Sequence, residues 1–302
     1  MDRQRPREVT SINARVTLFL RRHRVWLTLS GPLLVVAVLF GGGLLFGVVQ
    51  SLGFFPAAGL EDWTLANYIT VLTDQAFLGS LWLTFRIAFI STVLATVAAV
   101  CVALVLRRTF FGSRLTTFLY QIPLSVPHLV AAAGLVLLVS QSGILSRLGA
   151  GLGLIDRPGE FPVLVFDRPG VAIVLTFVWK EAPFIGLVVL AVLRSIGSEY
   201  EEVARTLGAS AWQRFFHVLV PLILPGVLSA SVIVFAFTFA SYEIPLLLGV
   251  RSPTTLPVLA FRQYQDPDLA MRSEAMAVSI ILTVVGFGLV FAYRRLVRYT
   301  VR

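Results

Sequence analysis

Residues 82–106 read WLTFRIAFISTVLATVAAVCVALVL, a stretch of 25 residues in which Arg86 is the one charged side chain. At about 1.5 Å per residue, a helix of this length crosses a hydrocarbon core of about 30 Å. Small residues recur at every fourth position of the stretch: Ser91, Ala95, Ala99 and Ala103. The stretch therefore predicts a membrane-spanning helix with one face that packs closely against another helix.

The rest of the chain repeats this apolar pattern. Further runs lie near residues 26–49, 119–140, 171–194, 223–248 and 274–293. Of all 302 residues, 57% are hydrophobic and 14% are charged, and the mean hydropathy is +0.86, which is too apolar for an ordinary soluble enzyme. The composition predicts an all-α, polytopic membrane protein with six transmembrane helices.

The Lys and Arg residues favour one side of the predicted membrane. The two tails and the loops after the second and fourth runs hold 17 of these 25 residues, whereas the alternate loops hold 6. By the positive-inside rule, both termini are predicted to be cytoplasmic, with the protein in the inner or plasma membrane. This topology accounts for the net charge of +9 better than nucleic-acid binding does, because nucleic-acid binders gather basic groups on one soluble face.

Residues 1–24 are polar and basic, and they predict a cytoplasmic N-terminal tail ahead of a membrane domain at residues 25–302. The first apolar run is 24 residues long from Trp26 to Val49. It exceeds the roughly 7–15 residues of a signal-peptide core, so we expect a retained anchor.

The loop between the fourth and fifth runs, residues 198–221, reads SEYEEVARTLGASAWQRFFHVLVP. Ser198 and Glu201 have the spacing of a capping box, which predicts the start of a helix. Four apolar residues then follow at helical spacing: Tyr200, Val203, Ala204 and Leu207. Gly208 is predicted to end this helix at positive φ, and Pro221 marks the start of the fifth run, so the loop predicts a helix, a sharp turn and a second helix.

This loop resembles the EAA loop of binding-protein-dependent ABC permeases, whose pattern is Glu-Ala-Ala, three residues, Gly, nine residues and Ile-x-Leu-Pro. Four positions match in type and spacing: Glu202, Ala204, Gly208 and Pro221. Three depart from the pattern with small or aliphatic side chains: Val203, Val218 and Val220. The resemblance extends over about residues 78–295 and implies a fold like that of type I ABC importer permeases.

In that family the short helix docks in a cleft of the ATPase and passes its motion to the membrane helices. The resemblance implies a set of ATPase-coupling residues: Glu202, Ala204, Leu207, Gly208, Ala209 and Pro221. It also implies four kinds of partner: two cytoplasmic ABC ATPases, a second permease subunit, identical or similar, an external solute-binding protein and membrane lipid. A rigid capped helix with a fixed turn transmits a displacement that a loose loop would absorb. The alternative is an amphipathic helix that rests on lipid headgroups.

The chain does not carry the residues for ATP hydrolysis itself. A P-loop requires a Lys after its Gly-rich turn, but the single Lys, Lys180, lies within the fourth apolar run and is followed by Glu181. The three His residues are far apart in the sequence, so no metal site is expected. We expect no enzymatic activity and no cofactor on this chain, with ATP bound by the partner subunit.

Ionisable groups at membrane depth are costly and mark candidates for a transport path. Lys180 and Glu181 lie about ten residues into the fourth run, and Glu243 follows near the end of the fifth. His128 follows Pro127, where a break in the third helix would expose carbonyl groups. These four residues are predicted to line or gate the translocation path, and the alternatives are a structural ion pair and a buried, satisfied His.

The transported solute is a small molecule whose class the sequence indicates only by resemblance. Residues 241–249 read SYEIPLLLG and are similar to the permease branch for polyamines such as spermidine and putrescine, and more loosely to those for sulfate and iron. A buried carboxylate would suit a polyamine cation. The alternative function is an ion-coupled secondary transporter or channel that acts without an ATPase.

Overall fold

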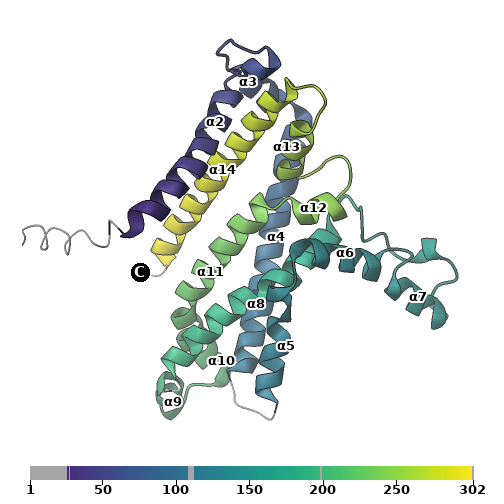
Figure 1. Ribbon diagram of the computed structural model, residues 1–302. Coiled ribbons are helices and arrows are strands. Elements are labelled where there is room, and N and C mark those ends of the chain that lie inside the picture. The colour runs from purple at the N-terminus through teal and green to yellow at the C-terminus, as the bar shows by residue number, and fades with distance from the viewer. Residues whose placement is uncertain (1–25, 27, 108–111, 198, 301–302) are drawn as a thin grey trace, which may run out of the picture.

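The computed structural model describes residues 26, 28–107, 112–197 and 199–300, with side chains up to residue 295, and the described part is built of helices (Figure 1). In chain order the α-helices are α2 (Gly42–Ser51), α3 (Ala66–Thr73), α4 (Gln75–Leu106), α5 (Ser113–Ser125), α6 (His128–Val139), α7 (Ile144–Gly151), α8 (Val171–Ile196), α9 (Glu199–Thr206), α10 (Ala211–Arg214), α11 (Val220–Ala240), α12 (Glu243–Leu248), α13 (Leu256–Tyr264) and α14 (Met271–Thr300). Two π-helical segments, η1 (Ala37–Gly41) and η4 (Phe215–Leu219), precede α2 and α11. The predicted all-α class is confirmed.

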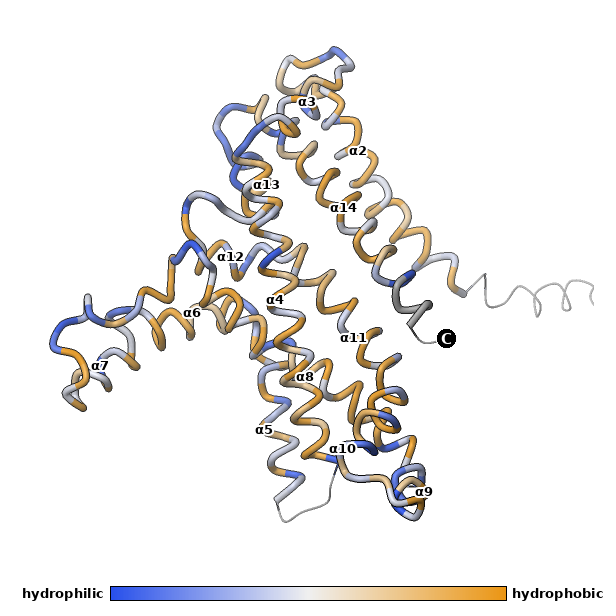
Figure 2. Tube along the Cα trace, turned by 180° about the vertical axis from the view of Figure 1, so that it is seen from behind, coloured by the Kyte–Doolittle hydropathy of each residue, from blue (hydrophilic) through white to orange (hydrophobic). Residues whose placement is uncertain are grey.

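Within the described residues, six helical segments are long and apolar enough to cross a membrane. They are Thr28–Ser51, Gln75–Leu106, His128–Gly151, Val171–Ile196, Ala211–Ala240 and Met271–Arg295. Figure 2 shows hydrophobic residues along these segments and hydrophilic residues at α9 and in the loops at the opposite end. The prediction of six transmembrane helices is confirmed, whereas the predicted tail at residues 1–24 lies outside the described residues.

The third predicted run, 119–140, is not one continuous helix. It is divided between α5 and α6, because Pro127 disfavours the helical conformation in the residue before it. Val126 is accordingly extended, with φ −81° and ψ 125°. The candidate span begins at His128, nine residues later than the predicted run.

The fifth predicted run, 223–248, is also divided, and here the prediction ended too late. Helix α11 ends at Ala240 and Ser241 is extended, with ψ 133°, before the short helix α12 begins. Pro245 explains the position of the break, since a proline ring clashes with the carbonyl group four residues earlier in a continuous helix, and that residue is Ser241. At its start the span reaches back to Ala211.

The small-residue stripe of α4 lies in the core, as predicted. Its four members are at most 1% exposed: Ser91, Ala95, Ala99 and Ala103. They allow α4 to pack along α8 and α11, where Ile185, Val189 and Ala230 belong to the same buried cluster. Thr96 and Ser231 add a hydroxyl–hydroxyl hydrogen bond of 2.8 Å between α4 and α11.

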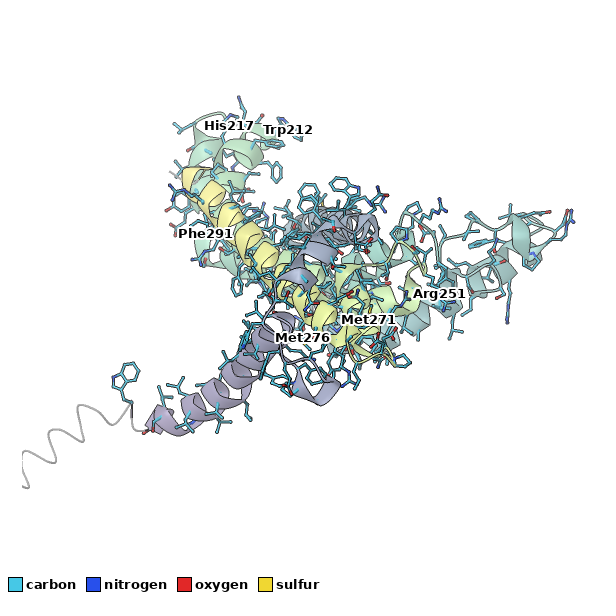
Figure 3. All side chains as sticks on the ribbon, turned by 90° about the horizontal axis from the view of Figure 1, so that it is seen from above. Trp212, His217, Arg251, Met271, Met276 and Phe291 are labelled. Carbon is cyan, nitrogen blue, oxygen red and sulfur yellow. The ribbon has the colours of Figure 1, made fainter. Side chains whose placement is uncertain are left out.

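Helices α2 and α14 lie side by side at one edge of the molecule, and α6 and α7 lead away at the other (Figure 1). Figure 3 shows Met276 where α14 passes α2. A Cβ atom on Gly47 would lie 3.5 Å from the sulfur of Met276, in ordinary van der Waals contact. Gly47 therefore packs against the Met276 thioether, with space for one methyl group between the two helices.

Candidate functional site

The segment 199–221, which we call the elbow, consists of α9, a turn, α10, η4 and the first residues of α11. The apolar side chains of α9 project into the surroundings instead of packing on this chain. Tyr200 is 56% exposed, Val203 59% and Leu207 82%. Since residues spaced by three and four positions share a helix face, these three side chains form one exposed apolar face.

The turn after α9 has the geometry that the sequence predicts. Gly208 has a φ of +84°, a conformation that residues with a Cβ atom adopt only with strain. The Gly208 N–H donates to the carbonyl of Arg205 and the Ala209 N–H to that of Ala204, both at 3.0 Å. This pair of bonds is a Schellman motif, and it satisfies carbonyl groups at the end of α9.

The second arm of the elbow has a capping box that the sequence reasoning missed. The Gln213 N–H donates to Oγ of Ser210, and the Ser210 N–H donates to Oε1 of Gln213, at 3.3 and 2.8 Å. The Ser-x-x-Gln spacing could have revealed it. The predicted cap at Ser198 lies outside the described residues.

The second arm continues into the membrane without a break. The π-helical segment η4 joins α10 to α11, so that the whole of Ala211–Ala240 forms one candidate span. Pro221 follows η4 within this continuous span, so the π-helical turn lies directly before the position where the missing N–H of proline interrupts the α-helical hydrogen bonds. In Figure 3, Trp212 and His217 lie at the same end of the molecule, and Trp212 is 72% exposed. The elbow is therefore joined to α11 by continuous helix.

At membrane depth, Lys180 holds the break between α5 and α6. Its side chain is 4% exposed, and Nζ donates to the carbonyl oxygens of Pro123 and Val126 at 2.6 and 2.5 Å. These carbonyls come from the end of α5, where the usual helical partners are lost, although the Pro123 carbonyl also accepts from the N–H of Val126 at 3.3 Å. At the break that Pro127 predicts, an ammonium group from α8 thus supplies hydrogen bonds to the backbone carbonyls.

Two neighbours of Lys180 contact the same joint. Glu181 Oε1 lies 3.5 Å from Nε2 of His128, the first residue of α6. Tyr120 of α5 donates its hydroxyl to the carbonyl of Ala182 at 2.7 Å. Three successive residues of α8 therefore fix the α5–α6 joint, which we define as Tyr120 to His128 together with Lys180, Glu181 and Ala182.

Lys180, Glu181 and Glu243, which are predicted to line or gate the translocation path, do not form one ion-paired group in the structure. Lys180 bonds to backbone carbonyls and Glu181 faces His128, whereas Glu243 is a half-buried residue at the start of α12. Among the described residues, no ion pair joins Lys180 to Glu181 or to Glu243, the alternative to a role in the path. Because Lys180 is covered by its own chain, its ammonium does not face an open path in this conformation.

Comparison with known proteins identifies a family and several relatives. The model of the family described as "binding-protein-dependent transport system inner membrane component" matches residues 91–302. The sulfate transport system permease protein CysW of Synechocystis sp. is 32% identical over 222 residues, which cover 72% of this chain and 77% of CysW. The molybdenum transport system permease protein ModB of Mycobacterium tuberculosis is 31% identical over 235 residues, which cover 75% of this chain and 84% of ModB.

Two further similarities extend over more of the chain. The trehalose/maltose transport system permease protein MalF of Thermococcus litoralis is 28% identical over 280 residues, which cover 89% of this chain and 92% of MalF. A solved structure of a bacterial ABC transporter involved in the import of the acidic polysaccharide alginate matches with a TM-score of 0.79 at 18% identity, covering 95% of this chain and 100% of that one. At this identity the structural match shows a shared fold.

Proposed function

The chain belongs to the family of binding-protein-dependent transport system inner membrane components and is a permease subunit of an ABC importer, and we propose that its elbow couples solute transport to a separate ATPase. The coupling residues in this proposal are those matched in the sequence: Glu202, Ala204, Leu207, Gly208, Ala209 and Pro221.

The exposed apolar face of α9 is the observation that carries the proposal. Leu207 is 82% exposed and shares its face with Tyr200 and Val203. The Schellman motif and the capping box fix the turn behind this face. An apolar face held rigidly by both caps suits docking to a partner protein and transmission of its motion.

We further propose that the elbow and both termini are cytoplasmic, as the Arg distribution predicts. The partners are then two ATP-binding subunits below the membrane, a second permease subunit beside this one and a solute-binding protein outside. A related importer structure contains a periplasmic protein bound to an alginate pentasaccharide, which supports the last of these partners by analogy. ATP binds to the partner ATPases in this arrangement.

We propose that Glu181 and His128 line the translocation path, and that Glu243, which lies just beyond the end of α11, contacts the solute at a separate point. The Glu181 and His128 side chains are 13% and 28% exposed, and their 3.5 Å separation is longer than that of a well-formed hydrogen bond. The two side chains are therefore not locked to each other, and Nε2 of His128 is buried in this conformation. Lys180 then has a positioning role in the path, since it holds the backbone from which His128 projects.

Among solutes, a polyamine cation is the first proposal, because Glu181 and Glu243 are carboxylates at membrane depth. The names of the relatives indicate sulfate, molybdenum and trehalose or maltose for those proteins. Uptake of labelled spermidine, sulfate, molybdate and maltose by the reconstituted complex tests the proposal directly. Uptake of sulfate alone, for example, would contradict a polyamine substrate.

The coupling proposal is tested with Gly208→Pro. Proline cannot adopt a φ of +84° and lacks the N–H that bonds to Arg205. We expect normal abundance in the membrane, continued ATP hydrolysis by the complex and loss of ATP-driven uptake. Gly112 has a φ of +85° and, like Gly208, has nothing within 4 Å of the position that a Cβ atom would take, so Gly112→Pro and Gly112→Ala are matched controls outside the elbow. Normal uptake by Gly208→Pro would overturn the proposal, and uptake without any ATPase would favour a secondary transporter or channel.

A further inference from the structure

A second connection leaves the elbow at the opposite side of α9 from its apolar face. Arg107, the residue that ends α4, directs its guanidinium at the carboxylate of Glu201 in the first turn of α9. Nη1 donates to Oε1, and Nη2 donates to Oε2 at 3.1 Å. The two residues are 94 positions apart in the sequence, so the pair joins two helices that the chain connects only through α5, α6, α7 and α8.

The geometry of this pair distinguishes it from an ordinary surface ion pair. Both oxygens of the carboxylate are engaged, and paired parallel bonds fix the relative orientation of guanidinium and carboxylate. The Arg107 and Glu201 side chains are only 20% and 21% exposed. Each charge also suits its own helix, because a cation is favoured at a helix C-terminus and an anion at an N-terminus.

Helix α9 has a glycine with positive φ near each of its ends. Gly197 precedes it with a φ of +71°, and Gly208 follows it with a φ of +84°. A hollow of about 470 Å³ lies behind it, lined in part by Leu193, Arg194 and Arg205. The Arg107–Glu201 pair crosses the rim of this hollow and braces α9 against the end of α4.

Helix α4 reaches from this brace to the other end of the molecule (Figure 1). Along its length it packs on α8 and α11. Near its far end, Thr84 Oγ1 accepts a hydrogen bond of 2.8 Å from the N–H of Leu256, at the start of α13. A displacement applied to α9 through the brace would therefore reach the opposite side of the membrane domain by a route separate from α11.

We propose that the Arg107–Glu201 pair is a strut that carries displacement of α9 into α4, so that the ATPase drives two membrane helices, α11 through the chain and α4 through the strut. The inference rests on the proposed coupling function. Arg107 and Glu201 are positioning residues in this arrangement, since they contact neither ATP nor solute.

The test is a charge-swap experiment in proteoliposomes that contain the complete importer. Uptake per ATP hydrolysed is measured for wild type, Arg107→Gln, Glu201→Gln and the swap Arg107→Glu/Glu201→Arg, using whichever of spermidine, sulfate, molybdate and maltose the wild type takes up. Docking of the ATPase is measured separately, by crosslinking from Leu207→Cys in a Cys101→Ser background. Arg114→Gln, a nearby exposed arginine, is the matched control.

We expect both single variants to keep ATPase docking and to lower uptake per ATP by roughly threefold or more, within the range of coupling between contacting residues. Uptake per ATP should be higher in the double variant than in either single variant. It should stay below the wild-type value, because the swap reverses the charge at both helix ends. Three results would each overturn the proposal. They are uptake per ATP at the wild-type level in both single variants, loss of ATPase docking in the single variants, and a double variant that transports no better than the single variants. Absence of ATP-driven uptake in the wild type would instead overturn the coupling function on which the strut rests.

Discussion

The elbow and the α5–α6 joint solve the same problem, a helix end with unpaired backbone groups, in opposite ways. The elbow pairs these groups locally, through Gly208 and the Ser210–Gln213 box, and leaves its apolar side chains exposed. The joint lies at membrane depth and takes its donor from another helix, where Lys180 is 57 residues from Pro123. The elbow is therefore a self-contained rigid unit, whereas the joint depends on the packing of α8 against α5 and α6.

Substitution of Lys180 should give the largest effect and separate the two regions most clearly. Lys180→Met removes the donor that the Val126 carbonyl has in the structure and one of the two donors to the Pro123 carbonyl, and an unsatisfied buried polar group costs about 1–3 kcal/mol. We expect a lower melting temperature in detergent and a lower abundance in the membrane. A matched elbow variant, Leu207→Ser, should change neither, since surface substitutions stay within about 0.5 kcal/mol. Equal stability of Lys180→Met and wild type would show that the α5–α6 joint does not need the hydrogen bonds of Lys180.

Substitution of Glu181 should act on transport more than on stability. Glu181→Gln keeps the size of the side chain but removes the charge that faces His128. We expect a several-fold loss of uptake at equal abundance, measured with the same labelled solutes. Transport at the wild-type rate would place Glu181 outside the path and leave the joint a purely structural feature.

The smallest effect is expected from the cap of the second arm. Ser210→Ala removes the acceptor for the Gln213 N–H, and loss of such a cap costs about 0.5–2 kcal/mol. Because α10 continues into η4 and α11, we expect local loosening without unfolding, detected as faster amide hydrogen exchange at residues 210–214. Unchanged exchange would mean that the elbow is held by its packing instead of its caps.

Local signals in the sequence were sufficient for the elbow. Gly208 follows an amphipathic segment at the position where a helix must end, so its positive φ was predictable from adjacent residues. The stripe from Ser91 to Ala103 was equally readable, because its period lies within one helix. The cap of the second arm is also readable locally, since Ser210 and Gln213 lie within four consecutive residues.

The joint and the division of the fifth run required information that is distant in the sequence or ambiguous in composition. Hydropathy does not distinguish one apolar helix from two, so the break at Ser241 depended on giving weight to Pro245. Pro127 indicated a break in the third run, but nothing near it indicates that Lys180 supplies the donor. Depth along the apolar runs does not reveal that Lys180 bonds to backbone carbonyls of α5 and Val126 while Glu181 faces His128, because those contacts depend on which helices pack together.

The central claim, that the elbow is a cytoplasmic docking site for a separate ATPase, is most directly tested by the accessibility of one engineered thiol. The chain has a single cysteine, so Leu207→Cys in a Cys101→Ser background reports on position 207 alone. We expect a membrane-impermeant maleimide to label this thiol only after spheroplasts are permeabilised, and co-expressed ATPase to protect it. Labelling from outside intact spheroplasts, or no protection by the ATPase in a complex that still transports, would contradict the claim.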